Sequence, residues 1–134
     1  MSHSSNCLFC DVQTVDKERI VAENEFAYVI RDGFPITVGH TLLIPKRHTI
    51  DYFGLVPAEV SAINQLMLVQ RKLLLEQDPT IGGFNISMNC GEIAGQSILH
   101  CHVHLIPRRK GDVESPKGGV RHVIPNKGNY KDLR

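Results

Sequence analysis

The 134-residue sequence contains no tryptophan, no long apolar run and almost no net charge. No apolar stretch approaches the roughly 20 residues that a membrane-spanning helix requires. The first ten residues, "MSHSSNCLFC", lack the apolar centre of a secretory signal. A formal net charge of +1 creates no strong field that would recruit nucleic acid or a membrane surface, so any anionic ligand must be held by local groups. We therefore expect a cytoplasmic protein with no nucleic-acid or membrane partner.

Cysteine is also scarce, with four residues at Cys7, Cys10, Cys90 and Cys101. In a cytoplasmic protein, thiols or metal ligands are more typical than disulfides. Cys7 and Cys10 form a C-x-x-C pair, but a thioredoxin-like redox pair requires a βαβ pattern that this sequence lacks. Four-coordinate structural zinc requires two more ligands, for which histidines not needed for chemistry are the candidates. Thiols on a frayed N-terminus remain the alternative.

The apolar and charged fractions, 42% and 22%, are typical of a globular protein. No repeat or internal linker divides the sequence. We therefore expect one domain over residues 1–134, with a core of about residues 7–110 and a basic C-terminal arm over residues 111–134.

The sequence predicts one substantial helix between two groups of strands. Pro57 suits the first helical position, Glu59 favours the helix dipole in the first turn, and Asp78-Pro79 ends the pattern. The apolar stripe of this helix comprises Val60, Ile63, Leu66, Met67, Leu73 and Leu74. The strands are two short runs around "ENE", then "HTLLIP", "FNISMN" and "ILHCHVHLIP". Short connections between strands predict an α+β fold with a largely antiparallel sheet.

Three histidines alternate along the last of these strands, at His100, His102 and His104. Side chains two residues apart on a strand share a face, so the three imidazoles form one polar stripe. A half-exposed strand that happens to carry histidines is one explanation. A metal site is a second, because an H-x-H pair can direct two nitrogens at one ion. A nucleophile is a third, because a neutral imidazole with one unoccupied nitrogen can attack phosphorus.

The segment "HCHVHLI" resembles the signature of the histidine-triad (HIT) family of nucleotidyl hydrolases and transferases, in which three histidines alternate with apolar residues. The preceding "GQS" and the upstream "GHTLLIPKRH" are similar to that family's other motifs, in the same order. The resemblance covers about residues 7–110. It implies a HIT-like fold with about five antiparallel strands, one long helix and a short N-terminal helix or turn, and a sheet continued across a homodimer.

The resemblance also implies roles for the histidines. His102 would attack the α-phosphorus of a nucleotide and form a nucleotidyl-histidine intermediate that water later hydrolyses, so that one hard displacement becomes two easier ones. His104 would contact the α-phosphate and stabilise the charge that develops there. His40 matches an additional histidine that flanks the triad, for which we expect an ordering role.

The same resemblance identifies residues that would contact the substrate. Gln96 and Ser97 match contacts to the phosphate and the leaving group, and Gly95 would let the backbone approach the ligand. Asn89 matches a position that reaches the nucleotide or the leaving group. Asp32 lies where the family places a side chain on the ribose hydroxyls, although an ordinary turn aspartate before a glycine is nearly as good an explanation.

Several bacterial members of the family combine an N-terminal C-x-x-C with two histidines. In this sequence the corresponding residues are Cys7, Cys10, His48 and His100. The resemblance therefore implies one structural zinc ion per chain, with all four positions filled by the protein and none left for a reactive water.

The resemblance leads us to expect an enzyme that cleaves nucleotides at the α-phosphorus. The sequence lacks the tryptophan found near the end of the phosphoramidase branch, which favours a diadenosine polyphosphate as substrate. The alternatives are a purine nucleoside phosphoramidase, a nucleotide-binding regulatory module with little turnover, and a metalloenzyme that uses all three stripe histidines around a catalytic ion.

Overall fold

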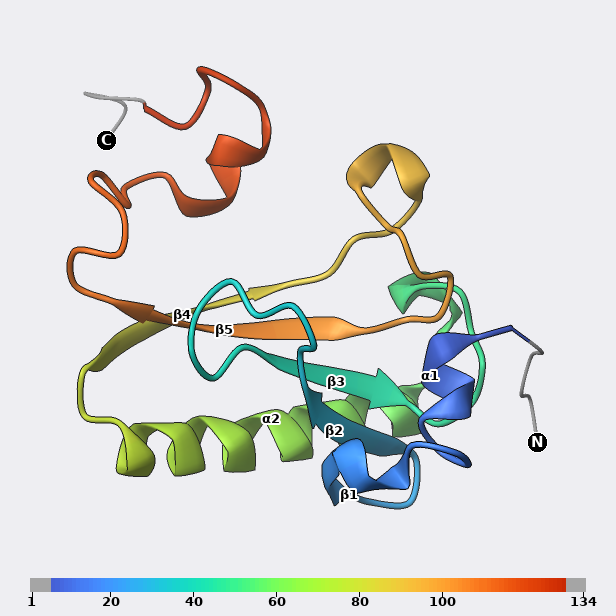
Figure 1. Cartoon of the computed structure of the whole chain (residues 1–134). Coiled ribbons are helices and arrows are strands. Elements are labelled where there is room, and N and C mark those ends of the chain that lie inside the picture. The colour runs from blue at the N-terminus through green and yellow to red at the C-terminus, as the bar shows by residue number, and fades with distance from the viewer. Residues whose placement is uncertain (1–5, 130–134) are drawn as a thin grey trace.

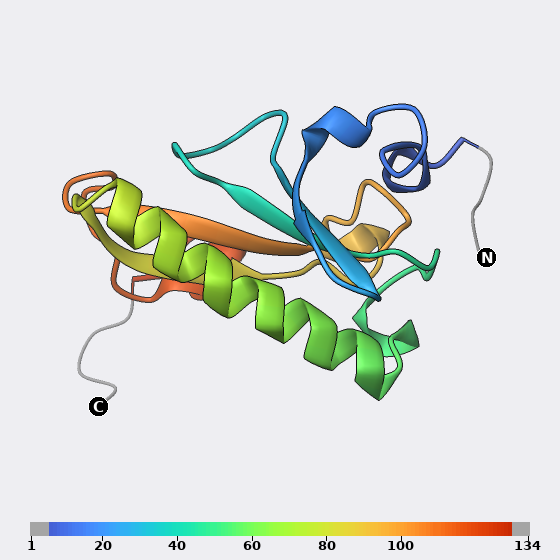
Figure 2. The same ribbon diagram turned by 90° about the horizontal axis from the view of Figure 1, so that it is seen from below.

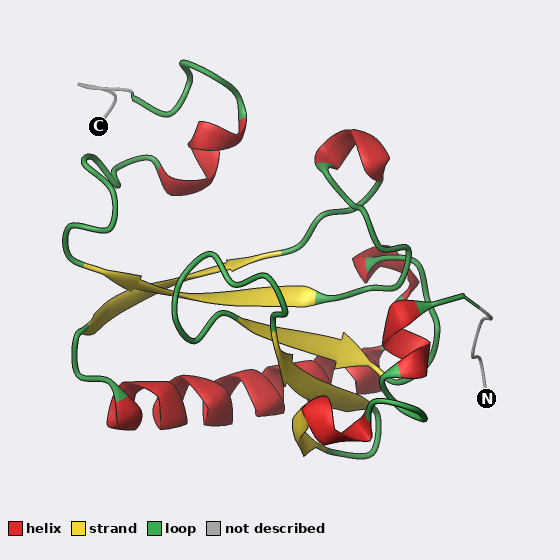
Figure 3. Cartoon of the chain, in the orientation of Figure 1, coloured by secondary structure: helices red, strands yellow, loops and turns green. Residues whose placement is uncertain are grey.

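The computed structural model describes residues 6–129 and contains a five-stranded antiparallel sheet with one long helix (Figures 1 and 3). The strand order is β1-β2-β3-β5-β4, so the last strand in sequence lies inside the sheet. The helices and strands are α1 (Leu8–Asp11), β1 (Ile20–Glu23), β2 (Ala27–Arg31), β3 (Thr41–Pro45), α2 (Pro57–Gln77), β4 (Ile81–Ser87) and β5 (Val103–Arg109), and the 3-10 turns are η1 (Lys17–Arg19), η2 (Tyr52–Gly54), η3 (Glu92–Ala94) and η4 (Gly119–Val123). The α+β class, the antiparallel sheet, the long helix and the short N-terminal helix are all confirmed.

The long helix α2 begins at Pro57, as the sequence predicts. Glu59 is 3% exposed, and its carboxylate accepts a hydrogen bond from the Val56 backbone amide at 2.9 Å, which satisfies one of the donors left over at a helix start. The same carboxylate receives two hydrogen bonds from the Arg47 guanidinium, at 2.8 and 3.0 Å. The pair ties the start of α2 to the segment that follows β3.

The buried face of α2 differs in part from the predicted stripe. Val60 and Leu73 are 38% and 39% exposed, so neither belongs to the buried face. The residues buried beyond the first turn are Ala62, Ile63, Leu66, Gln70 and Leu74.

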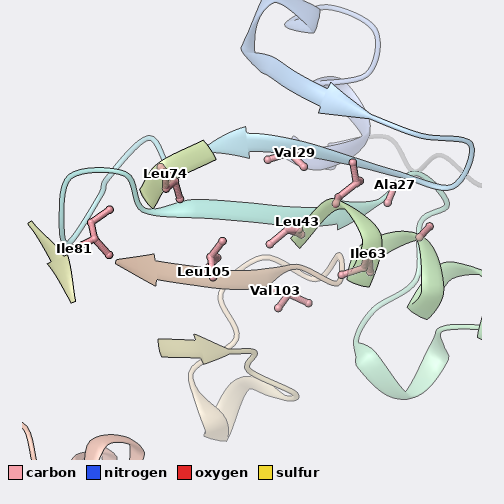
Figure 4. Close-up of a cluster of buried hydrophobic side chains, with 10 residues drawn as sticks. Ala27, Val29, Leu43, Ile63, Leu74, Ile81, Val103 and Leu105 are labelled. Atoms are coloured by element: carbon pink, nitrogen blue, oxygen red, sulfur yellow. The ribbon is translucent and has the colours of Figure 1, made fainter. Parts of the chain in front are cut away.

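The two faces of the sheet carry two separate apolar clusters. One cluster lies between the sheet and α2, and includes Val29, Leu43, Val103 and Leu105 (Figure 4). The other lies on the opposite face, where strand residues such as Leu42 contact the short helix α1 (Figure 2). Because side chains alternate along a strand, Val103 and Leu105 point toward α2, which leaves the intervening histidine for the α1 face.

The predicted strand over residues 98–107 is shorter at its start than expected, because β5 begins only at Val103. The backbone amide of Cys101 donates to the Thr49 carbonyl oxygen at 2.7 Å, so this segment follows the loop after β3 before it joins the sheet. His100 and His102 therefore precede the strand, and His104 lies inside it.

After β5 the described chain consists of turns and η4, up to residue 129. Residues 130–134 of the predicted arm lie outside the described residues. Within residues 6–129, no helix has the length and apolar character needed to cross a membrane.

Candidate functional site

The short helix α1 brings the cysteine pair against two histidines from distant parts of the chain. Cys7 Sγ lies 3.3 Å from His100 Nδ1, and Cys10 Sγ lies 3.5 Å from His48 Nδ1 and 3.6 Å from His100 Nδ1. The two Nδ1 atoms are 3.2 Å apart. These are the four residues that the family resemblance implies as metal ligands.

The geometry of this cluster suits a tetrahedral ion. Bonds of about 2.0–2.3 Å from a central zinc require ligand atoms about 3.3–3.8 Å apart, close to the separations observed. His100 is fully buried, and its Nε2 lies 2.8 Å from the Pro45 carbonyl oxygen. A carbonyl only accepts, so Nε2 carries the proton and Nδ1 presents its lone pair to the cluster. The four residues Cys7, Cys10, His48 and His100 could therefore hold a metal ion.

A pocket of about 530 Å³ opens beside this cluster, on the α1 face of the sheet. It is lined by six of the predicted site residues, namely Asp32, Asn89, Gly95, Ser97, His102 and His104. They come from the end of β2, from the loop between β4 and β5, and from the start of β5 (Figure 1). The antiparallel pairing of β3 with β5, in which Leu42 faces His104, brings these segments to one end of the sheet.

His102 is held by one nitrogen only. Its Nδ1 lies 2.8 Å from the His100 carbonyl oxygen, so Nδ1 carries the proton and donates. Nε2 then carries the lone pair, on a side chain that lines the pocket. The Phe9 ring packs against the imidazole at a centroid distance of 5.0 Å. Burial lowers the pKa of His102 from 6.5, so the ring is neutral at physiological pH.

His104 and His40 share a hydrogen bond, with His104 Nδ1 at 2.9 Å from His40 Nε2. The backbone amide of Ile36 donates to His40 Nδ1 at 3.2 Å, which leaves Nε2 as the protonated nitrogen of a neutral His40. His40 therefore donates to His104, whose own proton resides on Nε2. Burial lowers the pKa of His104 to about 4, helped by the nearby His102 and His40. Burial also lowers the pKa of His40, although Asp32 opposes the change.

His40, His104 and Asp32 form a second group of three possible ligand atoms, with Asp32 Oδ2 at 3.4 Å from His40 Nε2. The chemistry of this group differs from that of the cysteine cluster. A metal at His40 Nε2 would require the proton to move to Nδ1, where it would face the Ile36 amide hydrogen. The arrangement suits a chain of hydrogen bonds rather than a metal site.

The loop between β4 and β5 depends on a glycine. Gly95 has φ +99° and ψ 7°, a left-handed conformation that side chains rarely adopt. Its carbonyl oxygen accepts a hydrogen bond from Asn89 Nδ2 at 3.4 Å, which joins the two ends of the loop. Ser97 follows at the pocket wall. Three of the predicted substrate contacts are thus placed together by one turn.

Gln96 is placed differently from the expectation. Its side chain is 4% exposed, and its amide nitrogen donates to the carbonyl oxygens of Ile50 and Ile98 at 2.6 and 3.1 Å. Its amide oxygen accepts from the Gly91 backbone amide at 2.9 Å. These bonds occupy both ends of the amide, so Gln96 organises the loop rather than lining the pocket.

Sequence reasoning missed Arg19, which lies in η1 and also lines the pocket. A single arginine in a turn carries no motif, and only the tertiary structure brings it near Asp32. The exposed ring of Phe34, which is 92% accessible, lies at the same pocket wall.

Comparisons with known proteins identify the family. The family model described as "HIT domain" matches residues 13–111. The chain is 37% identical over 131 residues to an uncharacterized HIT-like protein of Mycoplasma genitalium, covering 97% of this chain and 88% of that protein.

Two solved structures are also similar. A zinc-bound histidine triad family protein from Mycobacterium smegmatis is 34% identical, with a TM-score of 0.71 over 82% of this chain and 80% of that one. A diadenosine triphosphate hydrolase from Plasmodium falciparum, in complex with cyclomarin A, is 29% identical, with a TM-score of 0.69 over 75% of this chain and 68% of that one. With the family model, the close relatives and the triad geometry in agreement, this chain belongs to the HIT family.

Proposed function

We propose that the chain is a nucleotide hydrolase that cleaves at the α-phosphorus through a covalent intermediate on His102. The observation that carries this proposal is the orientation of that imidazole. Its Nδ1 donates to the His100 carbonyl oxygen, so the lone pair on Nε2 belongs to a neutral ring at the pocket wall. This is the protonation state that a nucleophile requires.

In the first step, the Nε2 lone pair forms a bond to the α-phosphorus and the bond from phosphorus to the leaving-group oxygen breaks. The leaving group departs with the electron pair of that bond. In the second step, water attacks phosphorus and releases a proton to solvent, and the P–N bond breaks with its electron pair returning to Nε2. The nucleoside monophosphate is released and the neutral imidazole of His102 is restored.

The neighbouring side chains take the remaining roles. His104 donates from Nε2 to a non-bridging oxygen of the α-phosphate, where charge develops. His40 holds His104 in the tautomer that makes this possible. Asp32 accepts from the ribose hydroxyls.

Asn89, Gly95 and Ser97 form the wall that contacts the phosphate and the leaving group. Gln96, first expected to contact substrate, contributes by positioning this loop through its three hydrogen bonds.

A dinucleoside polyphosphate such as diadenosine tetraphosphate is the substrate that we propose. The similarity to a diadenosine triphosphate hydrolase supports it, as does the absence of tryptophan from the sequence. A nucleoside phosphoramidate remains the second candidate, because attack by His102 would be the same and only the leaving group would differ.

The test compares the wild-type protein with His102→Ala on diadenosine tri- and tetraphosphate, ADP and an AMP-lysine phosphoramidate. We expect the variant to lose at least about a thousandfold in turnover. Wild-type protein quenched during turnover should carry an AMP adduct on His102 by mass spectrometry. Unchanged turnover in the variant would falsify the mechanism, whereas tight AMP binding without turnover of any substrate would favour the regulatory module.

We also propose that the cysteine–histidine cluster holds one structural zinc ion per chain. The Cys2His2 donor set, the separations of the four atoms and the carbonyl partner of His100 support this. Bound zinc would tie α1 to the segment that carries His102. The similarity to a zinc-bound family member points the same way.

We further propose that the protein acts in the cytoplasm as a homodimer. Strand β4 lies at one edge of the sheet, and an apolar groove of about 520 Å³ runs between it and α2, lined among others by Val60, Met67, Ile86 and Met88. An uncovered edge strand pairs readily with a second copy.

The dimer is tested by sedimentation analysis. Ile86, which is 55% exposed on β4, is changed to glutamate, which should give monomers. Val21 on the opposite edge strand is 49% exposed, so Val21→Glu is the matched control and should remain dimeric. A monomeric wild-type protein would contradict the proposal.

A further inference from the structure

Arg19 is the single lysine or arginine among the residues that line the pocket beside His102. The guanidinium makes one long hydrogen bond, from Nη2 to the Arg31 carbonyl oxygen at 3.5 Å. No carboxylate among the described residues pairs with it. A cation without a counterion at a pocket wall is available for a ligand with hydrogen-bond acceptors.

The sheet order places Arg19 far from the reacting atoms. Arg19 immediately precedes β1, Asp32 follows β2, His40 precedes β3 and His104 lies in β5. The guanidinium itself lies at the end of β2, because Nη2 is 3.5 Å from the Arg31 carbonyl oxygen. Only β3 separates β2 from the strand that carries His104, so Arg19 and His104 are about two strand spacings apart, or about 10 Å. A nucleotide with its phosphorus at His102 and its ribose at Asp32 would direct its base away from β5, toward the part of the pocket that Arg19 and Gly33 line.

The wall around Arg19 suits a base rather than a second phosphate. Gly33 lies beside the guanidinium, such that an added Cβ would be 3.5 Å from Nη2. Leu8 and the exposed ring of Phe34 also line this pocket, and they offer apolar and aromatic surface on which a planar base can stack. The guanidinium of Arg19 is a fork of donors that carries no acceptor, so it can contact only acceptor atoms of a base.

We infer that Arg19 reads the purine base and makes the pocket select guanine over adenine. Guanine presents two acceptors, O6 and N7, on the edge that a guanidinium fork can contact with two hydrogen bonds. Adenine presents the N7 acceptor beside an amino group, which repels a second donor. This inference rests on the proposed function and extends it, because the guanosine-containing dinucleoside polyphosphate becomes the better substrate.

The experiment measures calorimetric affinities of the wild-type protein for GMP, AMP, IMP, CMP and 7-deaza-GMP. We expect GMP to bind about tenfold more tightly than AMP. IMP keeps O6 and N7 and should follow GMP, whereas 7-deaza-GMP lacks the N7 acceptor and should be weakened.

Arg19→Met should make the GMP and AMP affinities equal, and Arg19→Lys, which keeps the charge but loses the fork, should restore little of the preference. Lys17→Met, in the same turn, is the matched control and should behave as wild type. Thermal unfolding of each variant checks that the fold is intact.

Two results would overturn the inference. The first is equal affinity of the wild-type protein for GMP and AMP. The second is an equal loss of affinity for GMP, AMP and CMP in Arg19→Met, which would indicate that Arg19 contacts the phosphate. Failure of the proposed function looks different, since the protein would then turn over no nucleotide and form no adduct on His102, whatever its relative affinities for GMP and AMP.

Discussion

His40 Nε2 lies 2.9 Å from His104 Nδ1, while the Ile36 backbone amide donates to the other nitrogen of His40. One backbone N–H therefore determines the tautomers of two imidazoles in succession. His104 is left with its proton on Nε2, as a donor rather than an acceptor. A phosphate oxygen that gains negative charge is the ligand such a donor stabilises best.

Replacing His40 tests this chain of hydrogen bonds. In His40→Ala, His104 loses its donor partner and can adopt either tautomer, so kcat should fall by about 100-fold with little change in KM. His40→Gln keeps an amide donor and should recover part of the loss. Steady-state kinetics on one dinucleotide substrate measures both. Equal kcat values for the alanine and glutamine variants would show that the donor has no role.

Removing a ligand of the cysteine cluster should weaken the fold and the site together. Cys7→Ser should lose its zinc and more than about 4 kcal/mol of unfolding free energy, because α1 is no longer tied to His100. Turnover should fall as well, since Phe9 packs against His102 from the same helix.

Metal analysis and urea denaturation measure these effects. Cys90→Ser, which changes a cysteine outside the cluster, is the control and should keep both metal and stability. His102→Ala should also retain the ion. Loss of zinc from His102→Ala would instead support a catalytic metal.

The low pKa of His104, about 4 in the folded chain against an ordinary 6.5, should appear in the stability of the protein. Between these two pH values the unfolded state binds a proton at this position that the folded state does not. The contribution of His104 to the free energy of unfolding is therefore fully present above pH 6.5, and it is lost as the pH falls from 6.5 toward 4.

His104→Gln removes this titration, so the unfolding free energy of the variant should fall less steeply with pH across the same range. The difference in slope should correspond to the uptake of up to about one proton on unfolding. Urea denaturation at several pH values, with both proteins in the same metal state, gives the comparison. Parallel curves for the two proteins would mean that His104 titrates normally.

Gly95 should not tolerate a side chain. Alanine at φ +99° costs about 1–2 kcal/mol of strain, and its Cβ would lie 3.5 Å from Asn89 Nδ2. Gly95→Ala should therefore lower both stability and turnover. Gly82→Ala is the control, because that Cβ would meet nothing within 4 Å; a similar loss in both variants would point to a general effect of alanine.

Local patterns were enough to predict much of the fold. The helix from Pro57 and the antiparallel strands follow from periodicity and from short connections, which depend only on residues near one another in the chain. Burial was predicted less well, since Val60 and Leu73 are exposed and periodicity cannot say where an apolar stripe is centred. The start of β5 was wrong because the hydrogen bond from Cys101 to Thr49 joins distant segments.

The sequence by itself determined that three histidines share one side of a segment, since alternation is a property of the extended backbone. Alternation alone does not show what each histidine faces. The tertiary structure places His100 against the cysteines of α1, as the family resemblance implies, and it places His102 at the pocket and His104 against the ring of His40. It also buried Gln96 inside its loop and brought Arg19 to the pocket wall. These placements depend on which strands pair and where loops cross, and such long-range contacts leave no mark in the spacing of residues.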